Sequence, residues 1–143
     1  MPGAPQRIGD FAASYPADTS VIGEARRGFT AWLRRWVPDE DVIDDLALVL
    51  SELLANAVRA TSRTAARVQV LACADGRDVV LEVRNARTDW VDVESRWDLS
   101  DPLRAGGRGL LIVETLVDTL AVEHDERDGT TTVRSRRSVD QRG

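Results

Sequence analysis

The sequence contains no lysine, one cysteine and one histidine, and each of these scarcities excludes a class of site. All 19 basic residues are arginines, which excludes a phosphate-binding loop that depends on a lysine. Cys73 alone provides neither a disulfide framework nor a cysteine-based zinc site. His124 has no cysteine partner and is expected to be an exposed strand residue. A basic group that contacts phosphate here must therefore be a guanidinium.

Long hydrophobic runs are also missing. No apolar run approaches the roughly 20 residues that span a bilayer, and "MPGAPQRIGDF" lacks the pattern of a secretory signal. The net charge of -5 argues against direct binding of nucleic acid. We therefore expect a cytoplasmic protein without membrane contact, with one domain over residues 9–136 and tails at 1–8 and 137–143.

The spacing of apolar residues predicts two helices in the first half of the chain. Apolar residues recur at intervals of three and four from Val21 to about Trp36, and again after Pro38 to about Ala60. Before them, "FAASYPADTS" predicts a short strand broken at Pro16, with Thr19 or Ser20 capping the first helix.

The second half reads mainly as hairpins. Residues 66–86 alternate around the turn "ADGRD", and "LAVEHDERDGTTTVRS" gives two further short strands. A helix is predicted from about Leu110 to Leu120 between the two hairpins. The fold class is therefore α+β, a two-layer sandwich of a mixed, mostly antiparallel sheet with helices packed on one face.

Glycines gather directly before that last helix, in "GGRGLLIVETL". A helix N-terminus presents unpaired N–H groups and a positive dipole end, and glycines let a phosphate approach the backbone. Gly106, Gly107 and Gly109 suit such an anion site, and Arg108 among them can add a charged contact. The alternative is a flexible loop that ends in a turn.

A second polar pair lies on the predicted helix that ends near Ala60. Glu52 and Asn56, in "SELLANAV", are four residues apart and share one helix face at the edge of the apolar stripe. Such a position suits a carboxylate and an amide that face a pocket between helix and sheet. It also suits an ordinary solvated boundary, which is the interpretation favoured for this pair taken alone.

Taken together, "ELLANA", a hairpin, an irregular loop and "GGRGLLIV" resemble the histidine-kinase-like ATPase superfamily, over roughly residues 10–135. The chain is most similar to the anti-sigma-factor serine kinases. The resemblance implies ATP as cofactor, with Asn56 coordinating Mg²⁺ and Glu52 acting as general base. It also implies that Gly107, Arg108, Gly109 and Leu110 offer backbone N–H groups to the phosphates. The loop from about Ala86 to Ala105 would form a lid over the nucleotide.

The chain departs from that family where adenine should bind. The family pattern Asp-x-Gly-x-Gly reads "NARTD" here, so Asn85 stands at the aspartate position and Arg87 and Asp89 replace the glycines. The Asn85 amide oxygen can still accept a hydrogen bond from the adenine amino group, but without a charge. Side chains at Arg87 and Asp89 crowd a place where backbone should enclose the base. The histidine that often follows the "NA" motif is also absent from "NAVRAT".

Three functions therefore remain open. The first is an ATP-dependent serine/threonine protein kinase that binds a sigma factor and phosphorylates an anti-sigma antagonist. The second is a degenerate protein of the same fold that regulates by protein contact alone. The third, a detached histidine-kinase catalytic domain, is disfavoured because no helix carries a phosphoacceptor histidine. The resemblance also implies that a homodimer can form. Trp90 and Trp97 would fill the adenine pocket, anchor a partner, or fold onto the sheet.

Overall fold

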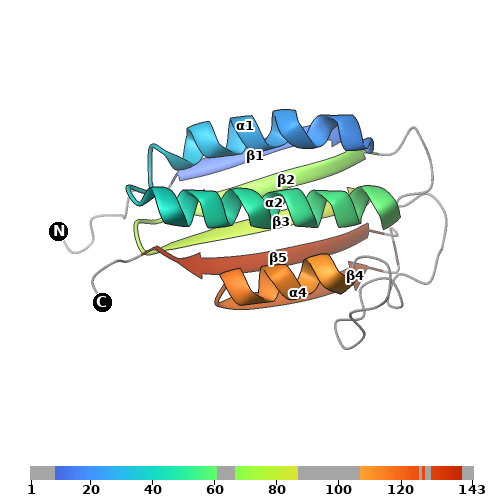
Figure 1. The fold of residues 1–143 in the computed structure, drawn as a ribbon. Helices are drawn as coiled ribbons and strands as arrows, with labels where there is room; N and C mark the ends of the chain where they lie inside the picture. The colour runs from blue at the N-terminus through green and yellow to red at the C-terminus, as the bar shows by residue number, and fades with distance from the viewer. Residues whose placement is uncertain (1–8, 61–66, 87–106, 126, 128–129, 140–143) are drawn as a thin grey trace.

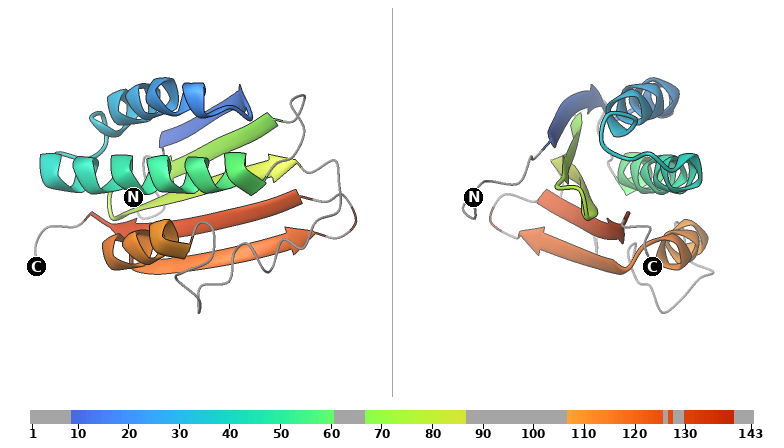
Figure 2. Two further views of the ribbon diagram at one scale, coloured as in Figure 1. Left: turned by 45° about the vertical axis from the view of Figure 1, so that its right-hand side comes forward. Right: turned by 90° about the vertical axis from the view of Figure 1, so that its left-hand side faces the viewer.

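A five-stranded antiparallel sheet carries helices on one of its faces (Figures 1 and 2). The computed structural model describes residues 9–60, 67–86, 107–125, 127 and 130–139. Along the chain the elements are β1 (Gly9–Pro16), η1 (Thr19–Val21), α1 (Ile22–Leu33), α2 (Glu40–Ala60), β2 (Arg67–Ala74), β3 (Asp78–Ala86), α4 (Gly107–Leu116), β4 (Thr119–Asp125) and β5 (Thr130–Ser138). The predicted two-layer α+β fold and both hairpins are confirmed.

The strand order is β1-β2-β3-β5-β4, and all four pairings are antiparallel. The parallel pairing that a mixed sheet would need does not occur among these strands. α1, α2 and α4 lie on the same face of the sheet, whereas no described element covers the other face (Figure 2). No helix in the described ranges is both long and apolar enough to cross a membrane.

The core forms where the apolar stripe of α2 meets the central strands. Every second residue of β2 and β3 points into this layer and is buried, beginning with Val68 on β2 and Val79 on β3. Leu46, Leu50 and Leu53 of α2 have no exposed surface. Each such side chain contributes about 1.5–3 kcal/mol relative to exposure. α2 is therefore the helix that holds the two layers together.

Aromatic residues join α1 to the edge strand β1. Phe29 and Trp32 of α1 stack with ring centroids 5.9 Å apart, and Phe11 of β1 lies 5.8 Å and 5.7 Å from them. Trp32 is thus a packing residue of α1. A Cβ atom at Gly9 would overlap the indole of Trp36, which explains why β1 begins with glycine.

Several predicted helix ends are wrong by a few residues. Neither Thr19 nor Ser20 caps α1, which has no side-chain cap; both residues lie in η1, and Asp18 caps η1 by accepting from Ser20 N at 3.1 Å. α4 begins at Gly107 instead of Leu110, so the glycines form its first turn. It ends at Leu116 instead of Leu120 because Asp118 N donates to Arg136 O at 2.8 Å, which starts β4 against β5.

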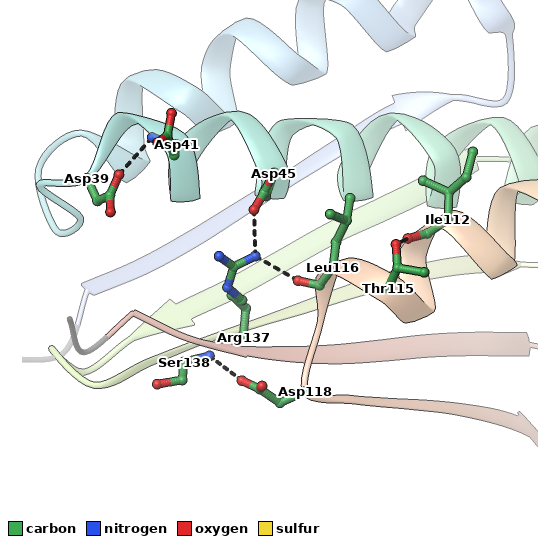
Figure 3. Close-up of polar contacts among 9 residues, drawn as sticks. All are labelled: Asp39, Asp41, Asp45, Ile112, Thr115, Leu116, Asp118, Arg137 and Ser138. Carbon is green, nitrogen blue, oxygen red and sulfur yellow. Dashed lines mark hydrogen bonds and ion pairs between the residues drawn. The ribbon is translucent and has the colours of Figure 1, made fainter. Parts of the chain in front are cut away.

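The described secondary structure also passes the predicted domain boundary at residue 136. β5 continues through Ser138, whose N–H donates to Asp118 Oδ2 at 2.6 Å (Figure 3). Val139, the next residue, is buried and donates from its N–H to Arg77 O at 2.7 Å.

The turn between β2 and β3 depends on Asp75. Its Oδ1 accepts hydrogen bonds from the backbone N–H groups of Arg77 and Asp78, both at 2.9 Å, and Gly76 takes a positive φ of 90°. These backbone hydrogen bonds lower the pKa of the Asp75 carboxyl group, because they favour its charged form. The turn is therefore stabilised by an ionised carboxylate.

We expect Asp75→Ala to lower the free energy of unfolding by about 0.5–1 kcal/mol at pH 7, a small effect because solvent screens this turn. A carboxyl group with a lowered folded-state pKa contributes stability above its unfolded pKa and loses it as the pH falls through the folded pKa. The difference between variant and parent should therefore shrink in acid. Urea denaturation at pH 7 and in acid measures it. Arg77→Ala is the control, since it keeps the backbone donors, and an equal loss there would contradict the assignment.

Candidate functional site

α2 brings Glu52 and Asn56 to the boundary between helix and sheet. The helix starts after Asp39, whose Oδ1 accepts from Asp41 N at 2.8 Å (Figure 3). Asn56 is only 4% exposed, whereas Glu52, one turn earlier, is half-buried. The sequence left open whether Glu52 and Asn56 face a pocket or form a solvated boundary. For Asn56 the structure excludes the solvated boundary. A buried amide must find hydrogen-bond partners inside the protein or from a ligand.

Arg59 supplies one partner of Asn56. Its Nη2 donates to Asn56 Oδ1 from three residues further along α2. The Arg59 side chain is exposed, so it can leave this position without disturbing the core. The oxygen that the resemblance assigns to a metal thus already contacts a cation.

Asn85 lies near the end of β3, on the side that faces the helices. It is 1% exposed and stands in register between Val68 of β2 and Thr131 of β5. Thr131 is equally buried, so a buried amide and a buried hydroxyl lie directly opposite each other on neighbouring strands. Two polar side chains thus lie at the end of a row that is apolar along the rest of β3.

His124 joins this polar group from β4, and its predicted exposed position is wrong. The ring is half-buried, and its Nδ1 lies 3.2 Å from Thr131 Oγ1. Thr131 was not among the predicted site residues, and His124 was predicted only as an exposed strand residue. The alternation of β4 and β5 could have found them, because His124 falls in the same row as Val122, and Thr131 in the same row as Val133.

The first turn of α4 contains Gly107, Arg108 and Gly109. Backbone N–H groups in a first turn have no partner four residues earlier in the helix, and they lie at its positive end. Leu110 is fully buried, so its side chain anchors α4 to the core and only its backbone is available to a ligand. The predicted anion-binding position is thus the start of a regular helix.

These elements meet at one end of the molecule. The C-terminal end of α2, the end of β3 and the start of α4 all lie on the right-hand side of Figure 1. α2 packs against both α4 and β3. The fold therefore brings the regions of Asn56, Asn85 and Gly107 to the same end, although about 50 residues separate the first from the last.

Some of the predicted site lies outside the described residues. This part consists of Gly106 and the predicted lid from residue 87 to 105, which includes Arg87, Asp89, Trp90 and Trp97. Within the described ranges, no three His, Cys, Asp or Glu side chains gather closely enough to hold a metal ion.

Arg137 fixes the opposite end of α4 to α2 (Figure 3). Its Nη1 donates to Asp45 Oδ2 at 2.9 Å and to the Leu116 carbonyl oxygen at 2.7 Å. The Leu116 carbonyl belongs to the last turn of α4, where a cation also complements the helix dipole. One guanidinium on β5 thus connects both helices that carry the candidate site.

The sequence of residues 15–136 matches the family described as Histidine kinase-like ATPase domain. The chain belongs to the histidine kinase-like ATPase domain family. The match includes Glu52, Asn56, Asn85 and the start of α4. No curated protein gives a significant match to this chain.

Two solved structures are similar to this histidine kinase-like ATPase domain. One is the crystal structure of the RsbU and RsbW domains of Rv1364c from Mycobacterium tuberculosis, with a TM-score of 0.63 and 21% identity. It matches 91% of this chain, which spans only 32% of that longer chain. The other is the SiaB–SiaC complex from Pseudomonas aeruginosa, with a TM-score of 0.61, 19% identity, and coverage of 94% of this chain and 92% of that one. At these identities the likeness concerns the fold.

We expect Arg137→Ala to lower the free energy of unfolding by about 1–2 kcal/mol, because it leaves Asp45 and the Leu116 carbonyl without this donor. Arg136→Ala, one residue earlier on the opposite face of β5, is the matched control and should change stability far less, since Arg136 is 54% exposed. Thermal and urea denaturation of both variants measure the difference. Equal losses would show that the Arg137 contacts do not hold the helices.

Proposed function

We propose that this histidine kinase-like ATPase domain is an ATP-binding, anti-sigma-type regulatory protein that phosphorylates a serine or threonine of an anti-sigma antagonist. The observation that carries the proposal is the meeting of four features at one end of the fold. They are the buried amide of Asn56, the carboxylate of Glu52, the buried Asn85–Thr131 pair and the first turn of α4.

The phosphates would lie against the first turn of α4. The N–H groups of Gly107, Arg108, Gly109 and Leu110 provide donors at the positive end of that helix. Without lysine in the chain, Arg108 is the cation next to these donors. A guanidinium binds phosphate oxygens in a bidentate manner, which an ammonium cannot do.

Asn56 could serve as a ligand of Mg²⁺, but its side-chain oxygen is occupied by Arg59. An amide oxygen is a hard ligand, and Mg²⁺ is usually bound by few protein groups together with phosphate oxygens and water. Asn56 Oδ1 could take this part only after the exposed Arg59 side chain had left it. Bound there, the metal would neutralise charge on the phosphates. Asn56 is the residue that would hold it, and Arg59 is the cation it would replace.

Glu52 would act as the general base. It lies one helical turn before Asn56 on the same face of α2. When the substrate hydroxyl attacks the γ-phosphorus, a new O–P bond forms, the bond to the bridging oxygen breaks and ADP leaves. The carboxylate of Glu52 takes the hydroxyl proton. Its half-buried position leaves it accessible to a protein substrate.

Adenine recognition would rest on Asn85 and Thr131. The Asn85 carbonyl oxygen can accept from the adenine amino group, and the Thr131 hydroxyl can donate or accept beside it. His124 holds the Thr131 hydroxyl through its Nδ1 and so restricts the direction of that hydroxyl. Adenine would therefore be recognised only by uncharged side chains.

The partner would be a protein. One similar structure is the complex of SiaB with SiaC, in which a protein chain of this fold occurs together with a second protein. For this chain we place a sigma factor or an anti-sigma antagonist in that role, in the cytoplasm. Such a partner would have to reach Glu52, which is half-buried and lies about two turns before the end of α2.

A second function is favoured by two observations. Arg59 contacts the oxygen that a metal would need, and Asn85 has no charge where the family pattern has an aspartate. Both fit a protein of this fold that binds no nucleotide and regulates by contact alone. Isothermal titration with ATP and Mg²⁺ separates the two functions: binding in the micromolar range supports the kinase, and absence of heat with a stable partner complex supports the scaffold.

We expect Glu52→Ala to reduce phosphotransfer to the antagonist at least about 100-fold while ATP affinity changes little, because a general base contributes to the reaction and not to nucleotide binding. Phosphotransfer from radiolabelled ATP and titration of the same preparation measure the two quantities. Asp44→Ala, an exposed acid earlier on α2, is the control. An active Glu52→Ala protein would refute the role of Glu52.

We expect Thr131→Val to weaken ATP binding at least about tenfold, because the nearly isosteric valine removes the hydroxyl from the adenine pocket. Thr132→Val provides a matched control, since Thr132 is the next residue of β5 and points to the opposite face of the sheet. Titration of both variants with ATP gives the comparison. If both bind ATP like the parent protein, adenine does not lie against Thr131.

A further inference from the structure

A polar cavity of about 1,060 Å³ is lined by a row of side chains on the sheet. The strand register forms the row, since Gln69 of β2 pairs with Arg84 of β3, Arg84 with Thr132 of β5, and Thr132 with Glu123 of β4. Val83, the residue before Arg84, is buried beneath the helices, so the row faces the other way. The row therefore lies on the opposite face of the sheet from the candidate site.

Arg84 has an unused hydrogen-bond donor. Its Nε atom is buried and makes no hydrogen bond to any residue in the described part of the chain. Its Nη2 lies 3.4 Å from Glu82 Oε1, a long contact, whereas Glu82 Oε2 accepts from Arg134 Nε at 2.8 Å. A buried donor without an acceptor is unfavourable. Because the Arg84 side chain as a whole is 42% exposed, an acceptor from another molecule can reach it.

The acceptor that fits this edge of Arg84 is a carboxylate. Nε–H and Nη2–H lie side by side on the planar guanidinium and match the two oxygens of a carboxylate. A phosphate dianion would carry twice the charge into a cavity that also contains acidic groups, among them Glu123. A single negative charge beside Arg84 is therefore favoured over a phosphate.

The far end of the row favours a positive charge on the ligand. Glu123 is exposed and lies two strands away from Arg84, about 9.6 Å at the usual strand spacing of about 4.8 Å. Asp125 and Arg127 also line the cavity, but they carry opposite charges on one turn, where Asp125 Oδ1 accepts from Arg127 N at 2.9 Å. The row thus offers a cation at one position and an anion two strands further on.

We propose that this cavity binds a peptide segment of a partner protein in the polyproline II conformation. An acidic side chain of the segment contacts Arg84, and a basic side chain three residues away contacts Glu123. Polyproline II has about three residues per turn and a rise of about 3.1 Å per residue, so residues three apart lie on one side at a separation of about 9.3 Å. This separation matches the two strand spacings between Arg84 and Glu123.

The neutral residues of the row suit the backbone of such a segment. Polyproline II has no internal hydrogen bonds, so its carbonyl oxygens need donors. The Gln69 amide and the Thr132 hydroxyl, which lie on either side of Arg84 in the row, can donate to them. Prolines between the two charged residues would bring no N–H group that needs an acceptor.

Titration of the nucleotide-free full chain with acetyl-Glu-Pro-Pro-Arg-amide tests the proposal independently of ATP binding. We expect a dissociation constant of about 0.1–1 mM, since an isolated short segment makes only two charge-assisted contacts. The Nε–H resonance of Arg84 in a proton–nitrogen correlation spectrum should move on binding. Acetyl-Glu-Pro-Arg-Pro-amide has the same composition but places the charges two residues apart, and it should bind at least about fivefold more weakly.

Paired changes in protein and peptide assign the two contacts. Arg84→Gln should weaken binding at least about tenfold and remove the effect of replacing the peptide glutamate by glutamine. Glu123→Gln should remove the effect of replacing the peptide arginine by glutamine, while the dependence on the peptide glutamate remains. Arg136→Gln is the matched control, because Arg136 lies on the same face of β5 but outside the cavity lining, and it should bind like the parent.

Three results would overturn the proposal. They are no binding at about 5 mM peptide, equal affinity for the two peptide spacings, and unchanged binding by a folded Arg84→Gln protein. Circular dichroism of each variant checks the fold, and the Arg84 resonance of the parent protein gives a readout that needs no variant. If free glutamate moves that resonance as far as the peptide does at the same concentration, the cavity takes a small carboxylate and the peptide assignment is wrong.

Discussion

Helix α2 has to bury a broad apolar face, and the central strands β2 and β3 provide the layer that receives it. Nearly every residue of that face, from Val42 to Ala57, has less than a tenth of its surface exposed. This contact determines the position of α2 along the strands. It therefore also determines which residues of α2 lie at the end of the sheet. The positions of Glu52 and Asn56 relative to Asn85 are a consequence of packing over about four turns of helix, not of contacts between the polar groups themselves.

The same packing explains why polar groups can be buried at one end only. Leu50, Leu53 and Leu54 fill the space next to the strands, whereas one turn later Asn56 enters the same layer as an amide. On the sheet, the row that begins with Val79 likewise ends with Asn85, and Thr131 lies beside it. Apolar burial stabilises most of the interface and offsets the free-energy cost of burying a few polar groups at its edge. A site built in this manner is rigid because its supports are core residues.

The sequence was sufficient for the architecture and for the positions that periodicity controls. Alternation in residues 66–86 and the helical stripe of α2 predicted both elements closely, because burial imposes periods of two and 3.6 residues. Helix ends were predicted less well: α4 includes the glycines because the chain must turn at Asp118 to pair with β5. Arg137 and Thr131 were missed, since their roles arise from partners about 20 to 90 residues away, at Leu116, Asp45 and Asn85. Pairings between distant strands cannot be read from local pattern.

The contact of Arg137 with the last turn of α4 has a mechanical consequence. A helix of ten residues is about 15 Å long, and here its far end is held by a guanidinium while its first turn contains two glycines. Between these two ends Leu110 and Val113 are fully buried, so the helix is held against the core along most of its length. A displacement at Leu116 would therefore reach the glycine end by moving the whole helix as one body.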